Sequence, residues 1–200
     1  MLTQQSLQAL RQAVLDCKAC KLACKPAGGR FTPTPSSGPL NAKIVIVGRS
    51  PGSEEERIGA PFSGPSGALL TQFLELAGIS RDQCYLTNLA MCHGHNRKPL
   101  PEEYEICQQW KKLEFTLVKP KIVILLGDEC YRFFYPSRLT STATEHGMVY
   151  EGFERKGYGS GFKVLVTVAP SFILKRRAHL PAIWGTDATV LRVLCRQLGV

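Results

Sequence analysis

The sequence contains no apolar run that approaches the roughly 18 residues of a membrane-spanning helix, so it indicates no membrane span. Its first residues lack the long apolar stretch of a secretory signal, and we find no internal repeat. Acidic residues are scarce, with 16 Asp and Glu against 25 Lys and Arg, which gives a formal net charge of +9. We therefore expect a monomeric, cytoplasmic protein with a polyanionic partner, although a soluble basic protein without such a partner would have the same charge.

The 200 residues suit one domain, 1–200, with a single hydrophobic core. Hydrophobic residues make up 44% and charged residues 20% of the chain, as in ordinary globular proteins. The chain also contains 8 cysteines. Because disulfides are uncommon in a reducing compartment, a clustered subset of these cysteines favours a metal site.

Four short apolar runs predict parallel strands that are buried on both faces. They are rich in β-branched residues and nearly continuous rather than alternating: 43–48, 84–90, 121–127 and 163–168. Helical patterns are found at 4–16, 65–77, 102–118, 128–135 and 182–198. This order predicts an α/β fold, a three-layer α/β/α domain with a central four-stranded parallel sheet. We expect 136–162 to form a long loop or a weak hairpin.

Unusual loops follow the predicted strands. Ligands of such sheets bind beyond the carboxyl ends of the strands, so these loops should converge on one place. The ends are Gly48-Arg49-Ser50-Pro51, Asn88, Gly127-Asp128 and Ala169-Pro170-Ser171.

Cysteines at 17, 20, 92 and 107 form a candidate metal site. The first helix delivers Cys17 and Cys20, and Cys92 and Cys107 would be the third and fourth ligands. Four thiolates suit either structural zinc or an iron–sulfur cluster, and their spacing does not separate the two. Cys24 could substitute for one of them. The remaining cysteines fall in strand or helix patterns and are expected in the core: Cys84, Cys130 and Cys195.

From about residue 7 to about residue 177, the chain resembles the family 4 uracil-DNA glycosylases, the iron–sulfur branch of their superfamily. The segments that carry the resemblance are Cys17-Lys-Ala-Cys20-Lys-Leu22, Val47 to Gly64, Gly67-Ala-Leu-Leu70, Gly78-Ile-Ser-Arg81, Tyr85-Leu-Thr-Asn88, Cys92 with Asn96-Arg-Lys-Pro99, Glu105-Ile-Cys107, Pro120 to Gly127, and Ala169-Pro-Ser-Phe-Ile-Leu174.

The resemblance implies an enzyme that hydrolyses the N-glycosidic bond of a base in DNA. Phe62 would stack on the extruded base, Asn88 would read its edge, and Glu55 would close the pocket beside the pyrimidine C5. The rest of the base-binding loop would be Gly48, Ser50, Pro51 and Gly52, the DNA contacts Pro170, Ser171, Lys175, Arg176 and Arg177, and the ligands of a structural [4Fe–4S] cluster Cys17, Cys20, Cys92 and Cys107. Base extrusion costs a few kcal/mol, and an aromatic platform recovers roughly 1–3 kcal/mol.

The chain differs from the family pattern at two positions that take part in the hydrolysis in that family. The family loop reads Gly-Glu-x-Pro-Gly, whereas this chain has Arg49 in place of the acid that is associated with positioning water. The later family motif reads His-Pro-Ser, whereas this chain has Ala169 in place of the imidazole that would stabilise the departing base. We treat both positions as part of the candidate catalytic site.

Three explanations of these departures stay open. In the first, Arg49 stabilises the leaving base or grips a substituent on it, and Ala169 opens space for a base larger than uracil, such as a glycosylated hydroxymethylpyrimidine of phage DNA. In the second, Ala169 is an engineered or inactivating change. In the third, the protein binds DNA without cutting it. A zinc-stabilised nucleotide-binding protein, unrelated to DNA, is the remaining class.

Several side chains have a second interpretation. Arg49 could pair with one of the acids at 54–56 and only brace the loop, while Glu55 or Glu56 could supply the missing carboxylate. Asp128 is a weaker candidate, because it could cap the following helix. We expect His93 and His95 to be exposed. We assign neither of them, nor His179, as a nucleophile.

Overall fold

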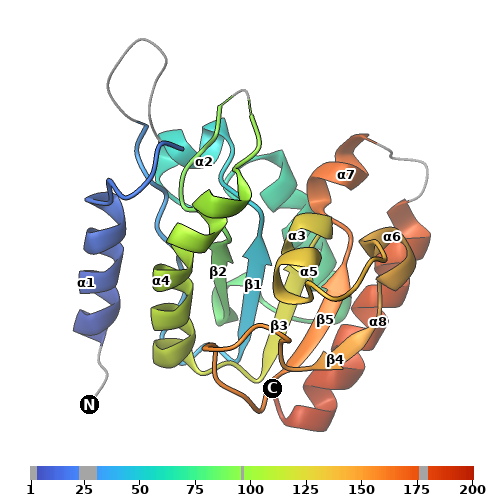
Figure 1. Cartoon of the computed structure of the whole chain (residues 1–200). Helices are drawn as coiled ribbons and strands as arrows, with labels where there is room; N and C mark the ends of the chain where they lie inside the picture. Colours follow the sequence, from blue (N-terminus) through green and yellow to red (C-terminus); the bar gives the residue numbers. More distant parts are fainter. Residues whose placement is uncertain (1–3, 23–30, 96, 176–179) are drawn as a thin grey trace.

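The computed structural model describes residues 4–22, 31–95, 97–175 and 180–200, and Figure 1 shows a sheet with helices on both faces. The elements in chain order are α1 (Gln4–Leu15), β1 (Ile44–Gly48), α2 (Ser53–Ile58), α3 (Pro65–Ala77), the 3-10 helix η1 (Arg81–Gln83), β2 (Cys84–Asn88), α4 (Pro101–Val118), β3 (Ile122–Leu126), α5 (Asp128–Phe134), α6 (Thr142–Glu145), β4 (Val149–Glu151), β5 (Lys163–Thr167), α7 (Pro170–Lys175) and α8 (Leu180–Leu198). None of the described helices is long and apolar enough to cross a membrane.

The sheet has the strand order β2-β1-β3-β5-β4. β1 pairs in parallel with both β2 and β3, and β3 pairs in parallel with β5, so the four predicted parallel strands are confirmed. Their carboxyl ends lie at one edge of the sheet, the upper edge in Figure 1, where α2 and α7 are also found. At this edge Gly48 lies opposite Asn88.

Alternate residues of the strands face opposite helix layers. In β1, Val45 and Val47 belong to the buried cluster that includes residues of α1, α4 and α5. Ile44 and Ile46 belong to the cluster that includes residues of α3 and α8. Because both faces are covered, the strands are apolar throughout, and the predicted three-layer α/β/α fold is confirmed.

The sheet contains one more strand than the four that the sequence predicts. β4 lies antiparallel to β5, with Val149 opposite Leu165, inside the segment 136–162 that we expected to be a long loop or a weak hairpin. Its three residues are only partly buried at the edge of the sheet, so the pattern is too short to identify from the sequence. The sequence analysis also missed α2, α6 and α7, which have four to six residues each.

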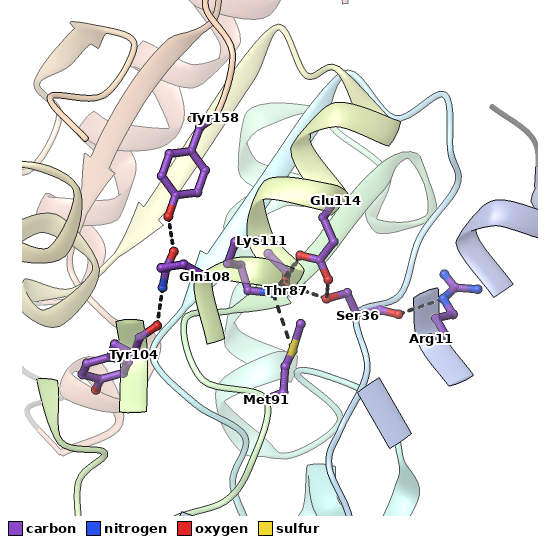
Figure 2. A network of polar contacts seen from close by, with 9 residues as sticks. All are labelled: Arg11, Ser36, Thr87, Met91, Tyr104, Gln108, Lys111, Glu114 and Tyr158. Carbon is purple, nitrogen blue, oxygen red and sulfur yellow. Dashed lines mark hydrogen bonds and ion pairs between the residues drawn. The ribbon is translucent and has the colours of Figure 1, made fainter. Parts of the chain in front are cut away.

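A buried ion pair on α4 connects this helix to β2 through hydrogen bonds with Thr87 (Figure 2). Lys111 Nζ lies 2.7 Å from Glu114 Oε2 and donates to Thr87 Oγ1 at 2.6 Å. Ser36 Oγ donates to the other oxygen of Glu114 at 2.5 Å. The side chains of Lys111 and Glu114 are 0% and 2% exposed. Burial lowers the pKa of Lys111, and the charge of Glu114 opposes that shift.

The same network reaches α1 and the end of β2. Arg11 Nε donates to the backbone oxygen of Ser36 at 2.9 Å, which attaches α1 to the segment before β1. Thr87 directly precedes Asn88 at the carboxyl edge of the sheet. The buried pair therefore fixes the position of a strand end that belongs to the candidate site.

We expect Lys111→Met to lower the free energy of unfolding by about 3–5 kcal/mol, because it leaves the Glu114 carboxylate buried without its cation. The double variant Lys111→Met/Glu114→Gln should lose less than the sum of the two single variants, since no unpaired charge stays buried. Chemical denaturation measures all three. The exposed neighbour provides a control, Lys112→Met, which should change stability by less than about 1 kcal/mol. Equal stability of Lys111→Met and this control would contradict the role of the pair.

Candidate active site and cysteine cluster

A polar cavity of about 240 Å³ opens at the carboxyl edge of the sheet. Eleven of the predicted site residues line it: Gly48, Arg49, Ser50, Pro51, Gly52, Glu55, Phe62, Asn88, Ala169, Pro170 and Ser171. A larger cavity of about 750 Å³ lies at the other end of the sheet, between the ends of α3 and α8, and is lined by none of the described site residues. We therefore take the smaller cavity as the candidate active site.

The floor of this cavity consists of Gly48, Asn88 and Phe62. A Cβ atom on Gly48 would lie 2.5 Å from Asn88 Oδ1 and 2.7 Å from Phe62 Cζ, so only glycine fits between them. Asn88 is buried at the end of β2. Phe62 has a φ of 55°, a left-handed conformation that costs a non-glycine residue of order 1–3 kcal/mol. Surrounding contacts must therefore hold Phe62 in place.

Arg81 supplies such contacts. Its guanidinium donates to the backbone oxygens of Phe62 at 2.8 Å, Pro61 at 3.2 Å and Gly67 at 3.2 Å. Burial lowers the pKa of Arg81, but an arginine stays protonated in proteins. The sequence analysis gave Arg81 no role, because its partners lie 14 to 20 residues away and no local pattern marks them.

Glu55 braces the loop between β1 and α3. One carboxylate oxygen accepts a hydrogen bond from the backbone N–H of Gly52 at 2.9 Å, and the other accepts one from Gly64 at 2.9 Å. Glu55 is 8% exposed and lines the cavity. These two hydrogen bonds shape the loop, and each carboxylate oxygen keeps a second acceptor site for a group in the cavity.

Arg49 pairs with Glu129, at the start of α5, and not with an acid of its own loop. The distance from Arg49 Nη1 to Glu129 Oε1 is 3.3 Å, and Lys98 Nζ lies 2.8 Å from the same oxygen. Burial alone would raise the pKa of Glu129, but the hydrogen bond from Lys98 and the charge of Arg49 hold it below its ordinary value. The interpretation that Arg49 pairs with an acid at 54–56 is wrong: Glu54 pairs with Arg57 instead.

Ala169 lies between the candidate active site and a second cavity of about 270 Å³. The two cavities share four lining residues: Arg49, Glu129, Ala169 and Ser171. Asp128 lines the second cavity, and its Oδ1 accepts hydrogen bonds from both the backbone N–H and the hydroxyl of Thr142 at 2.6 Å. Asp128 thus connects α5 to α6, whereas the residue at the N-cap position of α5 is Gly127.

The candidate DNA contacts lie next to this cavity. Pro170 is buried, whereas Ser171 and Lys175 are exposed on α7. Arg176, Arg177 and His179 lie outside the described residues. Figure 1 shows α7 beside the carboxyl edge of the sheet.

The two histidines of the loop after β2 also line the cavity. His95 is exposed, as predicted. The prediction for His93 is wrong: its side chain is only 17% exposed, because it packs against α2 with Nδ1 at 3.4 Å from Glu56 Oε2.

Three chain segments bring the predicted metal-binding cysteines together. Cys92, after β2, and Cys107, on α4, belong to the same buried cluster, and Cys20 packs against it. Burial raises the pKa of Cys107 to about 11, and the nearby charges of Cys20 and Cys17 act in the same direction. Burial thus favours the neutral thiol of Cys107, and a metal group bound here would stabilise the thiolate form instead. The other predicted core cysteines are buried, namely Cys84, Cys130 and Cys195, and Cys24 lies outside the described residues.

The chain is similar to known uracil-DNA glycosylases over most of its length. The family model described as the uracil DNA glycosylase superfamily matches residues 35–186. A type-4 uracil-DNA glycosylase of Thermotoga maritima is 31% identical over 177 residues, which cover 88% of this chain and 87% of that protein. A type-4 enzyme of Archaeoglobus fulgidus is 31% identical over 96% of this chain and 94% of its own length. A type-5 uracil-DNA glycosylase of Pyrobaculum aerophilum is 31% identical over 84% of this chain and 77% of its own.

We expect Gly48→Ala to destabilise the protein by about 1–3 kcal/mol and to displace Asn88 or Phe62, because the added methyl group overlaps both side chains. Gly185→Ala on α8 is a matched control, since a Cβ atom there meets nothing within 4 Å. An alanine in this helix should stabilise the fold by roughly 0.5–1 kcal/mol. Denaturant unfolding and a crystal structure of each variant measure these effects, and the same change in both variants would refute the close packing at Gly48.

Proposed function

Because the chain belongs to the uracil DNA glycosylase superfamily, in its type-4 branch, we propose that it is a DNA glycosylase. It flips a pyrimidine nucleotide of DNA into the cavity at the carboxyl edge of the sheet and hydrolyses the N-glycosidic bond. The observation that carries this proposal is the convergence of Phe62, Asn88 and Arg49 on one cavity. An aromatic face, an amide and a cation supply the contacts that an extruded base and its departure need.

Binding of the extruded base rests on Phe62 and Asn88. Stacking on an aromatic side chain recovers roughly 1–3 kcal/mol of the cost of unstacking the base. The amide of Asn88 offers one acceptor and two donors, so it can pair with both the N–H and the carbonyl of a pyrimidine edge. Since Asn88 is buried beside Gly48, its amide is held in place before the base arrives.

Departure of the base rests on Arg49. In hydrolysis the bond between C1′ of the sugar and the base nitrogen breaks, water oxygen bonds to C1′, and the base leaves with the electron pair. A guanidinium can donate hydrogen bonds to the negative charge that develops on the base, the task of the imidazole that Ala169 replaces. Glu129 positions Arg49 through their ion pair, and it shares its single negative charge between Arg49 and Lys98.

The two adjoining cavities favour a base larger than uracil. Ala169 lines both, and its methyl group leaves them less separated than a histidine would. The second cavity is lined by Lys98, Asp128, Thr142 and Lys175, which can hydrogen-bond a hydroxyl-rich substituent. We therefore propose a pyrimidine with a bulky polar group, such as the glycosylated hydroxymethylpyrimidines of phage DNA, as the preferred base, and defence against such DNA as the setting.

The four cysteines at 17, 20, 92 and 107 would hold a [4Fe–4S] cluster, which would stabilise the fold around the loop after β2. Zinc is the alternative. The cluster is favoured over zinc because the relatives of this chain are type-4 uracil-DNA glycosylases, the family whose resemblance implies it.

Base release from a panel of DNAs tests the proposed activity. We expect strand breaks, after cleavage of abasic sites, with DNA that carries glucosylated hydroxymethylcytosine, and weaker release of uracil. Arg49→Gln should slow release on the order of 10²–10³-fold, because it removes the charge at the leaving base. Arg57→Gln is the control, since Arg57 pairs with Glu54 at the surface and lines neither of these cavities.

Other outcomes of this experiment would favour one of the alternative functions. Release of uracil alone would reject the larger base, and unchanged rates for Arg49→Gln would reject its role at the leaving group. Binding of DNA without any release would favour a protein that binds DNA but does not cut it.

Replacement of a cysteine tests the cluster. We expect purified protein to be brown, with about four iron atoms per chain. Cys107→Ser should lose the colour and most of the iron, and its melting temperature should fall, because metal binding contributes to folding. Cys195→Ser is the control, since Cys195 is a buried thiol in the opposite helix layer and should leave the iron content unchanged. A colourless wild-type protein with bound zinc would overturn the cluster.

A further inference from the structure

Three side chains that the proposed base chemistry does not use meet at the rim of the active-site cavity. Glu56 lies on α2, and His93 and His95 lie in the loop that follows β2. Each offers one ligand atom, and these atoms lie within 4.8 Å of one another. Two imidazoles and one carboxylate are a donor set that binds zinc and other divalent transition metals. We propose that Glu56, His93 and His95 form a binding site for one divalent transition-metal ion.

The loop presents the two imidazoles in a fixed arrangement. Their ring centroids lie 4.9 Å apart, and the ring of Phe31 lies 4.0 Å from that of His95. His95 has a φ of 50°, a conformation that a non-glycine residue rarely adopts. A Cβ atom on Gly94 would lie 2.4 Å from the backbone oxygen of Arg97, so the loop needs glycine between the histidines. The backbone strain at His95 is the kind that clusters at functional sites.

The surrounding charges leave Glu56 available for a cation. Arg97 donates to both oxygens of Glu103, each at 2.7 Å. Arg49 and Lys98 both pair with Glu129, as described above. These three basic side chains thus pair with Glu103 or Glu129, while Glu56 faces His93.

The site differs in chemistry from the four cysteines, although His93 directly follows Cys92. Nitrogen and oxygen donors replace sulfur, and three protein ligands leave a coordination position open. Since His93 and His95 line the active-site cavity, that position faces the space where DNA would lie. It suits a water molecule or a phosphate oxygen of the DNA backbone. This inference concerns the rim alone and does not depend on which base is released.

Titration with Co²⁺ tests the site. Holoprotein of measured iron content is titrated anaerobically, and difference absorption follows the cobalt bands. We expect one Co²⁺ per chain, with d–d bands of a nitrogen- and oxygen-bound ion and without the sulfur-to-cobalt charge-transfer band that binding at cysteines would produce. Zn²⁺ should displace this cobalt, because it competes for the same ligands.

Variants locate the ion. His95→Asn and Glu56→Gln should each weaken Co²⁺ binding at least about tenfold, a loss of about 1.4 kcal/mol, while iron content and melting temperature stay at wild-type values. His146→Asn is the matched control, since His146 pairs with Asp187 away from this cavity, and it should bind like wild type. Absence of cobalt binding in wild type, equal binding in all variants, or a sulfur charge-transfer band that persists in His95→Asn would each overturn the proposal.

Discussion

The buried pair of Lys111 and Glu114 is the constraint on which the arrangement of the site depends. Taking two charges out of water costs several kcal/mol per ion, which is recovered only when the geometry is good and the remaining oxygens are hydrogen-bonded. Thr87 and Ser36 complete that geometry (Figure 2). An apolar pair could fill the same space, but it would not specify one register between β2 and α4. Because Thr87 precedes Asn88 and Lys111 lies one helical turn after Cys107, the register sets the positions of Asn88 and Cys107 together.

Next to this strand end, side chains hold the backbone of the loop that lines the candidate active site. Glu55 and Arg81 both direct their hydrogen bonds to the backbone between residues 52 and 67. They hold Phe62 in a left-handed conformation against Gly48, so the loop does not have to order itself when a base enters. Preorganisation of this kind reduces the entropy that binding costs. The charges of Glu55 and Arg81 therefore serve to fix the shape of the loop.

The sequence predicts the parts of the molecule that depend on local pattern. Continuous apolar runs identify the four parallel strands, and the motif around Asn88 and Phe62 identifies residues that the structure brings to one cavity. The sequence does not predict β4, because three residues, two half-buried and one exposed, are too few to show a period. The sequence does not predict the partners of Arg49 and Arg81 for another reason. Glu129 lies 80 residues from Arg49, and only the assembled sheet places these two residues side by side. Contacts between side chains of different helices and strands depend on the topology of the fold, and the spacing of residues along the chain does not predict them.

In the proposed reaction, the two departures from the family motif compensate for each other. Loss of the imidazole at position 169 alone would weaken stabilisation of the leaving base, and an arginine at position 49 alone would put a cation where the family has an acid. In the proposed reaction, Arg49 would supply the cation that an imidazole at position 169 would otherwise provide, and both positions line the same cavity. Ala169 also lines the second cavity, so its small side chain would leave the shared wall open to a larger base. The proposal thereby links the change of charge to the proposed preference for a larger substrate.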